Sequence, residues 1–283
     1  MGYRPMDFAG SWYPAGPRAC EQKILEFTTS PLPERSPRGR YGIAPHAGWV
    51  FSGPLAGRVF QAFPEGEEIG LVVVLGGHLG RGDPVVAMTE GEWDTPFGPF
   101  PINTGFRSDL DELDGVVFET EHRYRPDNST ELQLPFAKFR FPGAQLLPIR
   151  VPPSSLAIQL GRRLAAYLAR SGLRAVMVAS TDLTHYGPNY HFEPRGRGEE
   201  ALRWVREEND PAFIRAVESG EGEAILSTVH RCSNACSAGA VVALNEVARA
   251  EGLRFQPLAY GTSADTGPRD KRNFVGYLAG VYC

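Results

Sequence analysis

The segment Leu71-Val-Val-Val-Leu75, followed by Gly76-Gly77-His78, determines the fold class. Its five consecutive apolar residues include three β-branched valines and end at two glycines, which is typical of a strand buried on both faces of a parallel sheet. Further apolar runs bounded by turn residues predict strands at 41–44, 144–151, 175–179, 255–260 and 274–281.

Helical periodicity occurs between these runs. It predicts helices at 54–63, 130–139, 155–170 and 238–251. In the last of these, Val241 and Leu244 belong to an apolar stripe, and Asn245 and Glu246 are expected to face away from it. Alternating strands and helices indicate an α/β fold with a mostly parallel central sheet and helices on both faces. No internal repeat or long linker is present, so we expect a single domain over residues 1–283.

The composition restricts the classes of partner. The 29 Lys and Arg residues nearly balance the 33 Asp and Glu residues, the formal net charge is −4, and the basic residues form no run. We therefore expect no nucleic-acid partner and no membrane partner. The apolar stretch at 71–75 is far shorter than the roughly 20 residues that cross a bilayer. The N-terminus lacks the features of a signal peptide and the 4 cysteines do not suggest a disulfide framework, so a cytoplasmic protein is expected.

Chemically active side chains follow three of the predicted strands. His46 follows the run at 41–44, His78 follows the run at 71–75, and Asp182 and His185 follow the run at 175–179. Ligands of α/β sheets bind in the crevice at the carboxyl ends of the strands. We therefore expect these side chains to meet in one crevice, where small neighbouring residues allow close approach of the backbone.

Convergent imidazoles suggest a metal site, since histidine is a common ligand of zinc, iron and copper. Cys232 and Cys236 lie directly before the predicted helix at 238–251, where the helix dipole and a metal would both favour a thiolate. Either cysteine could supply a third ligand. The alternative is that both are small residues of the core.

Two further segments have both a functional and a purely structural interpretation. The carboxylate of Asp182 could orient His185, or His185 could move protons itself, whereas a capped turn with a surface histidine is the structural alternative. The segment Asn128-Ser-Thr-Glu131 predicts a helix start with Asn128 as the N-cap. Glu131 is then either a capping residue or a carboxylate of the pocket.

Aromatic residues near the N-terminus offer a possible ligand anchor. Trp12 and Tyr13 directly precede Pro14. Trp12 could contact a ligand, although core packing is the use that we favour for it. The remaining histidines lie in polar surroundings and are expected on the surface; these are His122, His191 and His230. The chain has no phosphate-binding loop, no nucleophile elbow and no H-E-x-x-H motif.

Seven segments, in matching order over nearly the whole chain, resemble the Memo family. They are Ala9-Gly-Ser-Trp-Tyr-Pro14, Ala44-Pro-His-Ala-Gly48 with Ser52-Gly53, Gly76-Gly-His78, Trp93-Asp-Thr-Pro-Phe-Gly98, Ser129-Thr-Glu-Leu-Gln-Leu-Pro135, Ser180-Thr-Asp-Leu-Thr-His-Tyr-Gly187, and Tyr260-Gly-Thr-Ser263 with Val275-Gly-Tyr277. The resemblance implies kinship with class III extradiol (LigB-type) ring-cleaving dioxygenases, whose non-haem iron lies at the edge of an α/β sheet. Bacterial and archaeal members are also named AmmeMemoRadiSam system protein B.

The resemblance also implies roles for individual residues. The family's metal-binding histidines correspond to His46 and His78, its acid/base pair corresponds to Asp182 and His185, and the cysteine of its C-G-x-x-P-I pattern corresponds best to Cys232. That segment reads Cys232-Ser-Asn-Ala-Cys236-Ser here, so a shift to Cys236 stays open. The family's E-H-S-x-E segment reads Asp127-Asn128-Ser-Thr-Glu131, with Asn128 in place of a histidine.

Two functional hypotheses follow. The first is a metal-dependent redox enzyme that acts on a small-molecule substrate and holds Fe(II), with copper as the alternative and zinc less favoured, because a thiolate is softer than a carboxylate. The second is a non-catalytic protein that reuses the dioxygenase-like pocket to bind a ligand or a peptide. In either case the resemblance suggests functional association with other components of the AmmeMemoRadiSam system.

Overall fold

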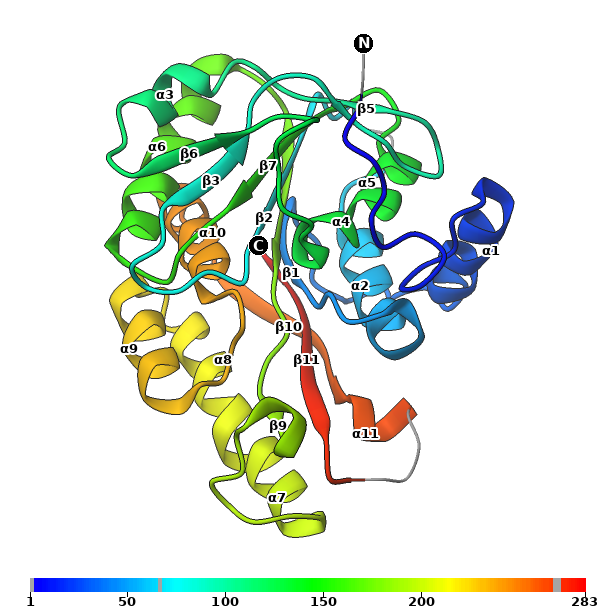
Figure 1. Ribbon diagram of the computed structural model, residues 1–283, viewed down its shortest axis with the longest axis vertical. Coiled ribbons are helices and arrows are strands. Elements are labelled where there is room, and N and C mark those ends of the chain that lie inside the picture. Colours follow the sequence, from blue (N-terminus) through cyan, green and yellow to red (C-terminus); the bar gives the residue numbers. More distant parts are fainter. Residues whose placement is uncertain (1–2, 66–67, 267–270) are drawn as a thin grey trace.

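A computed structural model describes residues 3–65, 68–266 and 271–283 of the chain (Figure 1). Within these residues nine strands form one sheet in the order β10-β11-β1-β8-β2-β7-β3-β6, with β9 paired to β11 outside this path. A separate two-stranded sheet joins β4 to β5. The strand bounds are Tyr41–Ala44 (β1), Leu71–Gly76 (β2), Val85–Met88 (β3), Glu92–Trp93 (β4), Phe100–Pro101 (β5), Val116–Glu119 (β6), Gln145–Arg150 (β7), Ala175–Ser180 (β8), His185–Tyr186 (β9), Phe255–Thr262 (β10) and Phe274–Tyr282 (β11).

The middle of the sheet is parallel and its margins are mixed. Strands β1, β8, β2 and β7 run parallel to one another. At one margin β11 is antiparallel to β1, and at the other β3 is antiparallel to β7. The predicted α/β fold with a mostly parallel sheet is therefore confirmed, with antiparallel pairs on either side of the parallel centre.

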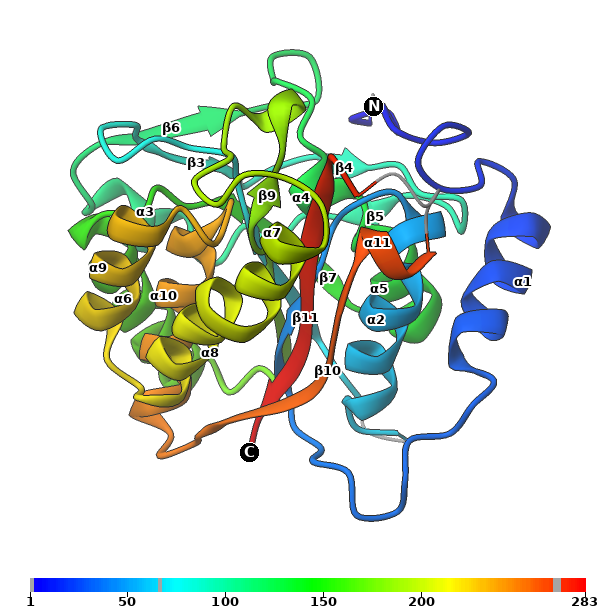
Figure 2. The ribbon, with the colours of Figure 1, turned by 90° about the horizontal axis from the view of Figure 1, so that it is seen from below.

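Helices cover both faces of the sheet (Figure 2). On one side lie α6, α9 and α10, and on the other lie α1, α2 and α5. The helix bounds are Pro17–Thr28 (α1), Trp49–Ala62 (α2), Arg107–Asp111 (α3), Asn128–Glu131 (α4), Leu134–Arg140 (α5), Ser155–Ser171 (α6), Glu199–Trp204 (α7), Asp210–Glu218 (α8), Gly222–Cys232 (α9), Ala238–Ala250 (α10) and Ser263–Thr266 (α11), with a 3₁₀-helix at Pro188–Tyr190 (η1) and a π-helix at Val205–Asn209 (η2).

The alternation of side chains along the central strands produces two hydrophobic cores. Leu71, Val73 and Leu75 of β2 pack in the core that contains α6 and α10. Val72 and Val74 point to the opposite face, where α2 and α5 complete a second core. All six residues of β2 are buried, as a strand between two helical layers requires.

Two predicted helices and one predicted helix cap differ from the observed ones. The helix predicted at 54–63 begins earlier, at Trp49, so that Pro54 lies inside it. The helix predicted at 130–139 is two helices, α4 and α5, because Pro135 has no N–H to bond the carbonyl of Glu131 and continue the first one. The cap of α4 is Asp127, whose side chain accepts from the Thr130 N–H, and not the predicted Asn128.

Helix α10 is buried all round, which the predicted amphipathic pattern did not suggest. Asn245 and Glu246 were expected to face away from the apolar stripe, but they are only 1% and 6% exposed. The amide of Asn245 donates to the Gly220 carbonyl, and Glu246 pairs with Arg162 of α6. Polar residues can occupy this buried helix because each has a partner on a neighbouring element.

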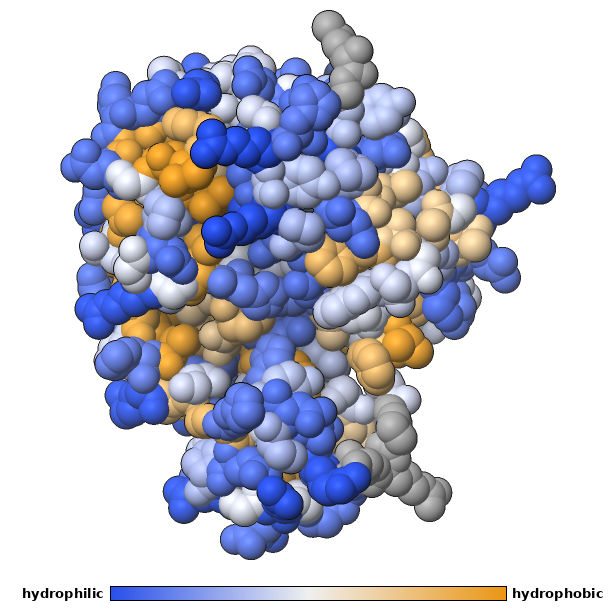
Figure 3. All heavy atoms as spheres, in the orientation of Figure 1, coloured by the Kyte–Doolittle hydropathy of each residue, from blue (hydrophilic) through white to orange (hydrophobic). Residues whose placement is uncertain are grey.

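The surface in Figure 3 is mainly hydrophilic, with hydrophobic side chains gathered at the upper left. In Figure 1 the edge strand β6 lies in this region, and its Val117 is 49% exposed. Over the described residues, no helix combines the length and the apolar character that spanning a membrane requires.

Candidate metal centre

His46 and His78 come together at the carboxyl ends of two strands. His46 lies two residues after β1 and His78 two residues after β2, and both strands pair in parallel with β8. Their Nε2 atoms are 3.2 Å apart, and the two rings meet edge to face with centroids 4.9 Å apart. The expected convergence of these strand-end histidines is therefore present.

Two glycines allow the backbone before His78 to approach its neighbours. A Cβ on Gly76 would lie 2.4 Å from Ser129 Oγ, and Gly77 has a φ of +108°, which side-chain-bearing residues rarely adopt. The Gly77 N–H donates to Ser129 Oγ at 2.6 Å. The His78 backbone is thereby held against α4, which begins beside Asp127.

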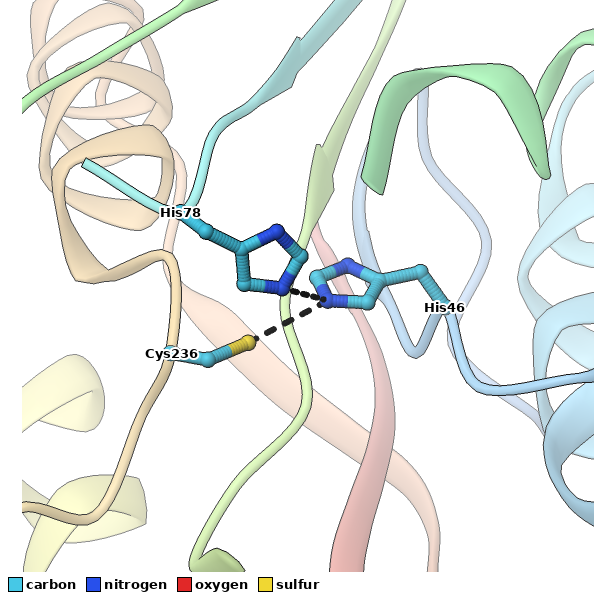
Figure 4. A group of neighbouring side chains, drawn as sticks. All are labelled: His46, His78 and Cys236. Carbon is cyan, nitrogen blue, oxygen red and sulfur yellow. Dashed lines mark hydrogen bonds between the residues drawn. The ribbon is translucent and has the colours of Figure 1, made fainter. Parts of the chain in front are cut away.

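Cys236 supplies the sulfur atom of this group. Its Sγ lies 3.2 Å from His46 Nε2 (Figure 4). Helix α9 ends at Cys232, and Ser233 then adopts a left-handed conformation with φ +49° that turns the chain towards the sheet. The Cys236 N–H donates to the Asp182 carbonyl at 3.1 Å, and Cys236 Sγ accepts from the Asp182 N–H at 3.3 Å.

The sequence register that favoured Cys232 as the sulfur ligand is therefore corrected to Cys236. Cys232 lies in the last turn of α9, and its backbone carbonyl accepts from the Asn209 amide. Among the described residues, the donor atoms that could share one ion belong to His46, His78 and Cys236, all within 4.8 Å of one another.

The spacing of the three donor atoms fits one metal ion. Bonds of about 2.0–2.1 Å to imidazole nitrogen and about 2.3 Å to thiolate sulfur place the donors of a tetrahedral ion roughly 3.3–3.7 Å apart. The observed separations from His46 Nε2 are 3.2 Å to His78 Nε2 and 3.2 Å to Cys236 Sγ. Only small movements of these side chains would be needed to hold an ion.

The second nitrogen of each histidine also has a partner. His46 Nδ1 lies 3.1 Å from Ser180 Oγ, and His78 Nδ1 lies 3.7 Å from an oxygen of Asp127. Contacts of this kind orient metal-binding imidazoles and leave the opposite nitrogen free to donate its lone pair to the metal. The sequence interpretation missed Ser180 and Asp127, although Asp127 opens a run of cap-forming residues that could have indicated it.

The electrostatics of the group favour a thiolate. Burial opposes ionisation of Cys236, but the nearby imidazoles of His46 and His78 outweigh it, and the pKa of this thiol lies well below its ordinary value. Burial likewise lowers the pKa of His78, yet Asp127 and Cys236 raise it to about 10 overall. The thiolate favours a bound cation, but the cation must displace the protons of the histidines in order to bind.

Asp182 and His185 adjoin this group but contact different partners. Asp182 Oδ1 accepts from the His46 N–H at 2.7 Å, and burial raises the pKa of this carboxyl despite its proximity to His46 and His185. His185 Nδ1 lies 3.1 Å from the carbonyl oxygen of Leu183. Since a carbonyl only accepts, Nδ1 carries the proton and Nε2 is the basic nitrogen. Asp182 thus positions the His46 backbone, and the Leu183 carbonyl orients His185.

Glu131 is neither a capping residue nor a carboxylate of the pocket. It is 1% exposed and accepts hydrogen bonds from the Asp7 N–H, the Phe8 N–H and the Tyr13 hydroxyl. These contacts attach residues 7–13 to α4. Asn128, which lies beside the cavity, donates from its Nδ2 to the His46 carbonyl at 3.2 Å.

A cavity of about 830 Å³ opens onto the two histidines. The residues that line it include Asp182, His185 and Trp12. Trp12 is 39% exposed, so the interpretation of Trp12 as a core residue is wrong, whereas its neighbour Tyr13 is buried. His122, His191 and His230 are exposed, as expected.

Comparisons with known proteins identify relatives of this chain. The family model described as Memo-like protein matches residues 4–281. A MEMO1 family protein of Aeropyrum pernix is 32% identical, with 99% of each chain covered, and the MEMO1 family protein PH1626 of Pyrococcus horikoshii is 30% identical, with 96% of each chain covered. The crystal structure of an uncharacterized protein of Escherichia coli K12, JW3007, aligns with a TM-score of 0.46 and 14% identity, covering 85% of this chain and 98% of that one.

Proposed function

Because the chain belongs to the Memo-like protein family, and because three donor atoms from separate loops converge beside a cavity, we propose that it is a metal-dependent redox enzyme. The ion is held by His46, His78 and Cys236. The observation that carries this proposal is the convergence of two imidazoles and one thiolate at the carboxyl end of the sheet, with a cavity of about 830 Å³ next to them.

The donor set is compatible with a redox-active metal. Two imidazoles with a thiolate suit iron, copper and zinc, and two histidines with one anionic ligand leave positions open, as in non-haem iron oxygenases. We propose Fe(II) as the native metal, with copper as the alternative that a soft thiolate favours. When bound, such a metal would supply electron-transfer or dioxygen chemistry to a small molecule in the cavity.

The side chains around the metal donors have different roles in the proposed reaction. His185 lines the cavity, and its basic Nε2 can accept a proton from a substrate hydroxyl. Asp182 holds the His46 backbone in place through the 2.7 Å hydrogen bond, and Trp12 and Tyr190 line the cavity with aromatic surface. The chemistry that these residues support is proton removal from a substrate that lies beside the metal.

Metal analysis of two cysteine variants tests the site. Tag-free protein prepared anaerobically under reducing conditions is expected to contain one metal per chain, with the same content in Cys232→Ser and a large loss in Cys236→Ser. Cys232→Ser is the matched control, because it removes a sulfur atom only four positions away. The site would be refuted if Cys236→Ser retained its metal while Cys232→Ser lost it. An unchanged metal content in a His46→Ala/His78→Ala double variant would also refute the site.

Oxygen consumption tests the reaction. The Fe(II)-loaded protein is expected to consume dioxygen with at least one member of a panel of catechols and related aromatic diols, and His185→Gln is expected to slow this reaction without reducing metal content. Failure of the whole panel with fully loaded protein would refute the dioxygenase-like reaction.

The exposed aromatic residues of the cavity favour a second candidate function. Trp12 and Tyr190 are 39% and 41% exposed, and Val50 beside them is 70% exposed. Large exposed apolar side chains around a cavity are typical of ligand-binding or peptide-binding sites. A ligand that binds with equal affinity to wild type and to Cys236→Ser, in the absence of oxygen consumption, would support a binding protein in place of an enzyme.

A further inference from the structure

Asn209 and Asp210 form a buried polar pair next to, but outside, the metal centre. They lie where the π-helix η2 joins α8, and they are 4% and 0% exposed. A buried amide beside a buried carboxylate is costly unless each polar atom has a partner. The partners of this pair lie on the two loops that carry His185 and Cys236.

The Asn209 side chain joins these two loops directly. Its Nδ2 donates to Thr184 Oγ1 at 2.8 Å and to the Cys232 carbonyl at 3.2 Å. An amide nitrogen has two hydrogens, so each loop receives one of them. Thr184 directly precedes His185, and Cys232 begins the five-residue segment that ends at Cys236.

The backbone of Asn209 provides another link to the cysteine loop. Its carbonyl accepts from Asn234 Nδ2 at 2.7 Å, and Asn234 is fully buried. Asn234 lies between Cys232 and Cys236 in the sequence. The loop that positions the sulfur is therefore held from the Asn209 side as well as by the direct contact of Cys236 with Asp182.

Asp210 connects the same pair to the sheet. Its Oδ1 accepts from the Thr184 N–H at 3.1 Å and from the Thr184 hydroxyl, and its Oδ2 accepts from the Tyr260 hydroxyl of β10 at 2.7 Å. A Cβ on Gly276 would lie 2.0 Å from Asp210 Oδ2, so β11 closely approaches the carboxylate. The position of Asn209 is thereby fixed relative to the strands.

The local helix geometry supports a functional use of this junction. Five residues, Val205–Asn209, form a π-helical turn between α7 and α8. Such turns are rare in proteins overall, but many of those that occur lie at functional sites. The turn ends at the residue whose amide links the two loops.

We propose that Asn209 is a positioning residue of the metal centre, which sets the separation between the loop of the proton-transferring His185 and the loop of the sulfur ligand Cys236. This inference rests on the proposed metal site. Asn209 touches neither metal donor nor substrate and acts through Thr184 and the segment 232–236.

An isosteric substitution with a matched control tests the inference. Asn209→Leu keeps the size of the side chain and removes both hydrogen bonds. Asn245→Leu removes another fully buried amide, which donates to the Gly220 carbonyl and contacts neither loop. Co(II) titration is expected to show at least about tenfold weaker binding in Asn209→Leu, with a changed thiolate-to-cobalt absorption band, and wild-type values in Asn245→Leu.

A second measurement does not require metal. In metal-free protein, alkylation of Cys236 by iodoacetamide, located by peptide mass spectrometry, is expected to be severalfold faster in Asn209→Leu than in wild type or Asn245→Leu. If Asn209→Leu does not fold, Thr184→Val removes the hydroxyl that Asn209 contacts and is expected to change both readouts in the same direction.

The outcomes separate the two proposals. Wild-type protein that binds no Co(II) would remove the proposed function, and the alkylation rates would still decide the role of Asn209. Wild-type binding that persists unchanged in Asn209→Leu and Thr184→Val, with unchanged alkylation of Cys236, would overturn the positioning role and leave the metal site intact.

Discussion

Replacement of Glu131 by glutamine is expected to remove a pH dependence of stability that this buried carboxyl causes. Glu131 is buried and accepts hydrogen bonds from the Asp7 N–H, the Phe8 N–H and the Tyr13 hydroxyl. Burial raises the pKa of Glu131 to about 7 from its ordinary value of 4.5, and these three hydrogen bonds offset this rise only in part. A neutral amide in the same position has no such titration.

The magnitude follows from proton linkage. A pKa raised from 4.5 to about 7 corresponds to about 3 kcal/mol, at 1.36 kcal/mol per pKa unit. The folded state binds the proton more tightly than the unfolded state, so the contribution of Glu131 to stability is fully present below pH 4.5 and is lost as the pH rises through about 7. Wild type should therefore lose about 3 kcal/mol relative to Glu131→Gln over this interval.

Urea unfolding of both proteins at several pH values between 4.5 and 8 measures this difference, and other titrating groups cancel in the subtraction. Substitution of the exposed Glu68 by glutamine is the matched control for loss of a carboxyl group at the surface. If the free energy of unfolding of wild type minus that of Glu131→Gln stays constant or grows with pH, the conclusion that burial raises the pKa of Glu131 is refuted.

Three further outcomes are expected. Asp127→Asn, which removes the charge beside His78 Nδ1, should weaken Co(II) binding about 10- to 100-fold, and an unchanged affinity would show that this contact does not tune the ligand. Gly77→Ala should destabilise the protein by about 1–3 kcal/mol, because residue 77 has a φ of +108° and an added Cβ would collide with Arg150. Gly82→Ala is the control, since an added Cβ there meets open space, and equal melting temperatures of the two variants would contradict the prediction. Phe136→Ala should cost about 3–5 kcal/mol in urea unfolding, since the ring is 1% exposed and stacks in an aromatic cluster; a loss below about 1 kcal/mol would exclude that packing role.

The sequence alone was sufficient to predict the central strands of the sheet and the proximity of two site residues, His46 and His78. The apolar run at 71–75 predicts a strand with both faces buried because burial between two helical layers requires apolar residues at consecutive positions. His46 and His78 could then be placed together, because parallel strands bring their carboxyl ends to one edge of the sheet. Strand β6, at one edge of the sheet, has only three consecutive apolar residues, and it was not predicted.

The tertiary structure alone decided the sulfur atom and the role of Glu131. Cys232 and Cys236 are equivalent in local sequence, and the choice depends on the left-handed turn at Ser233 and on hydrogen bonds to Asp182, which is 54 residues away along the chain. Glu131 has partners 118 to 124 positions away, so neither its burial nor its raised pKa has a local signal. Local propensity and periodicity act over a few residues, whereas the separation of donor atoms and the desolvation of a carboxyl depend on which distant segments pack together.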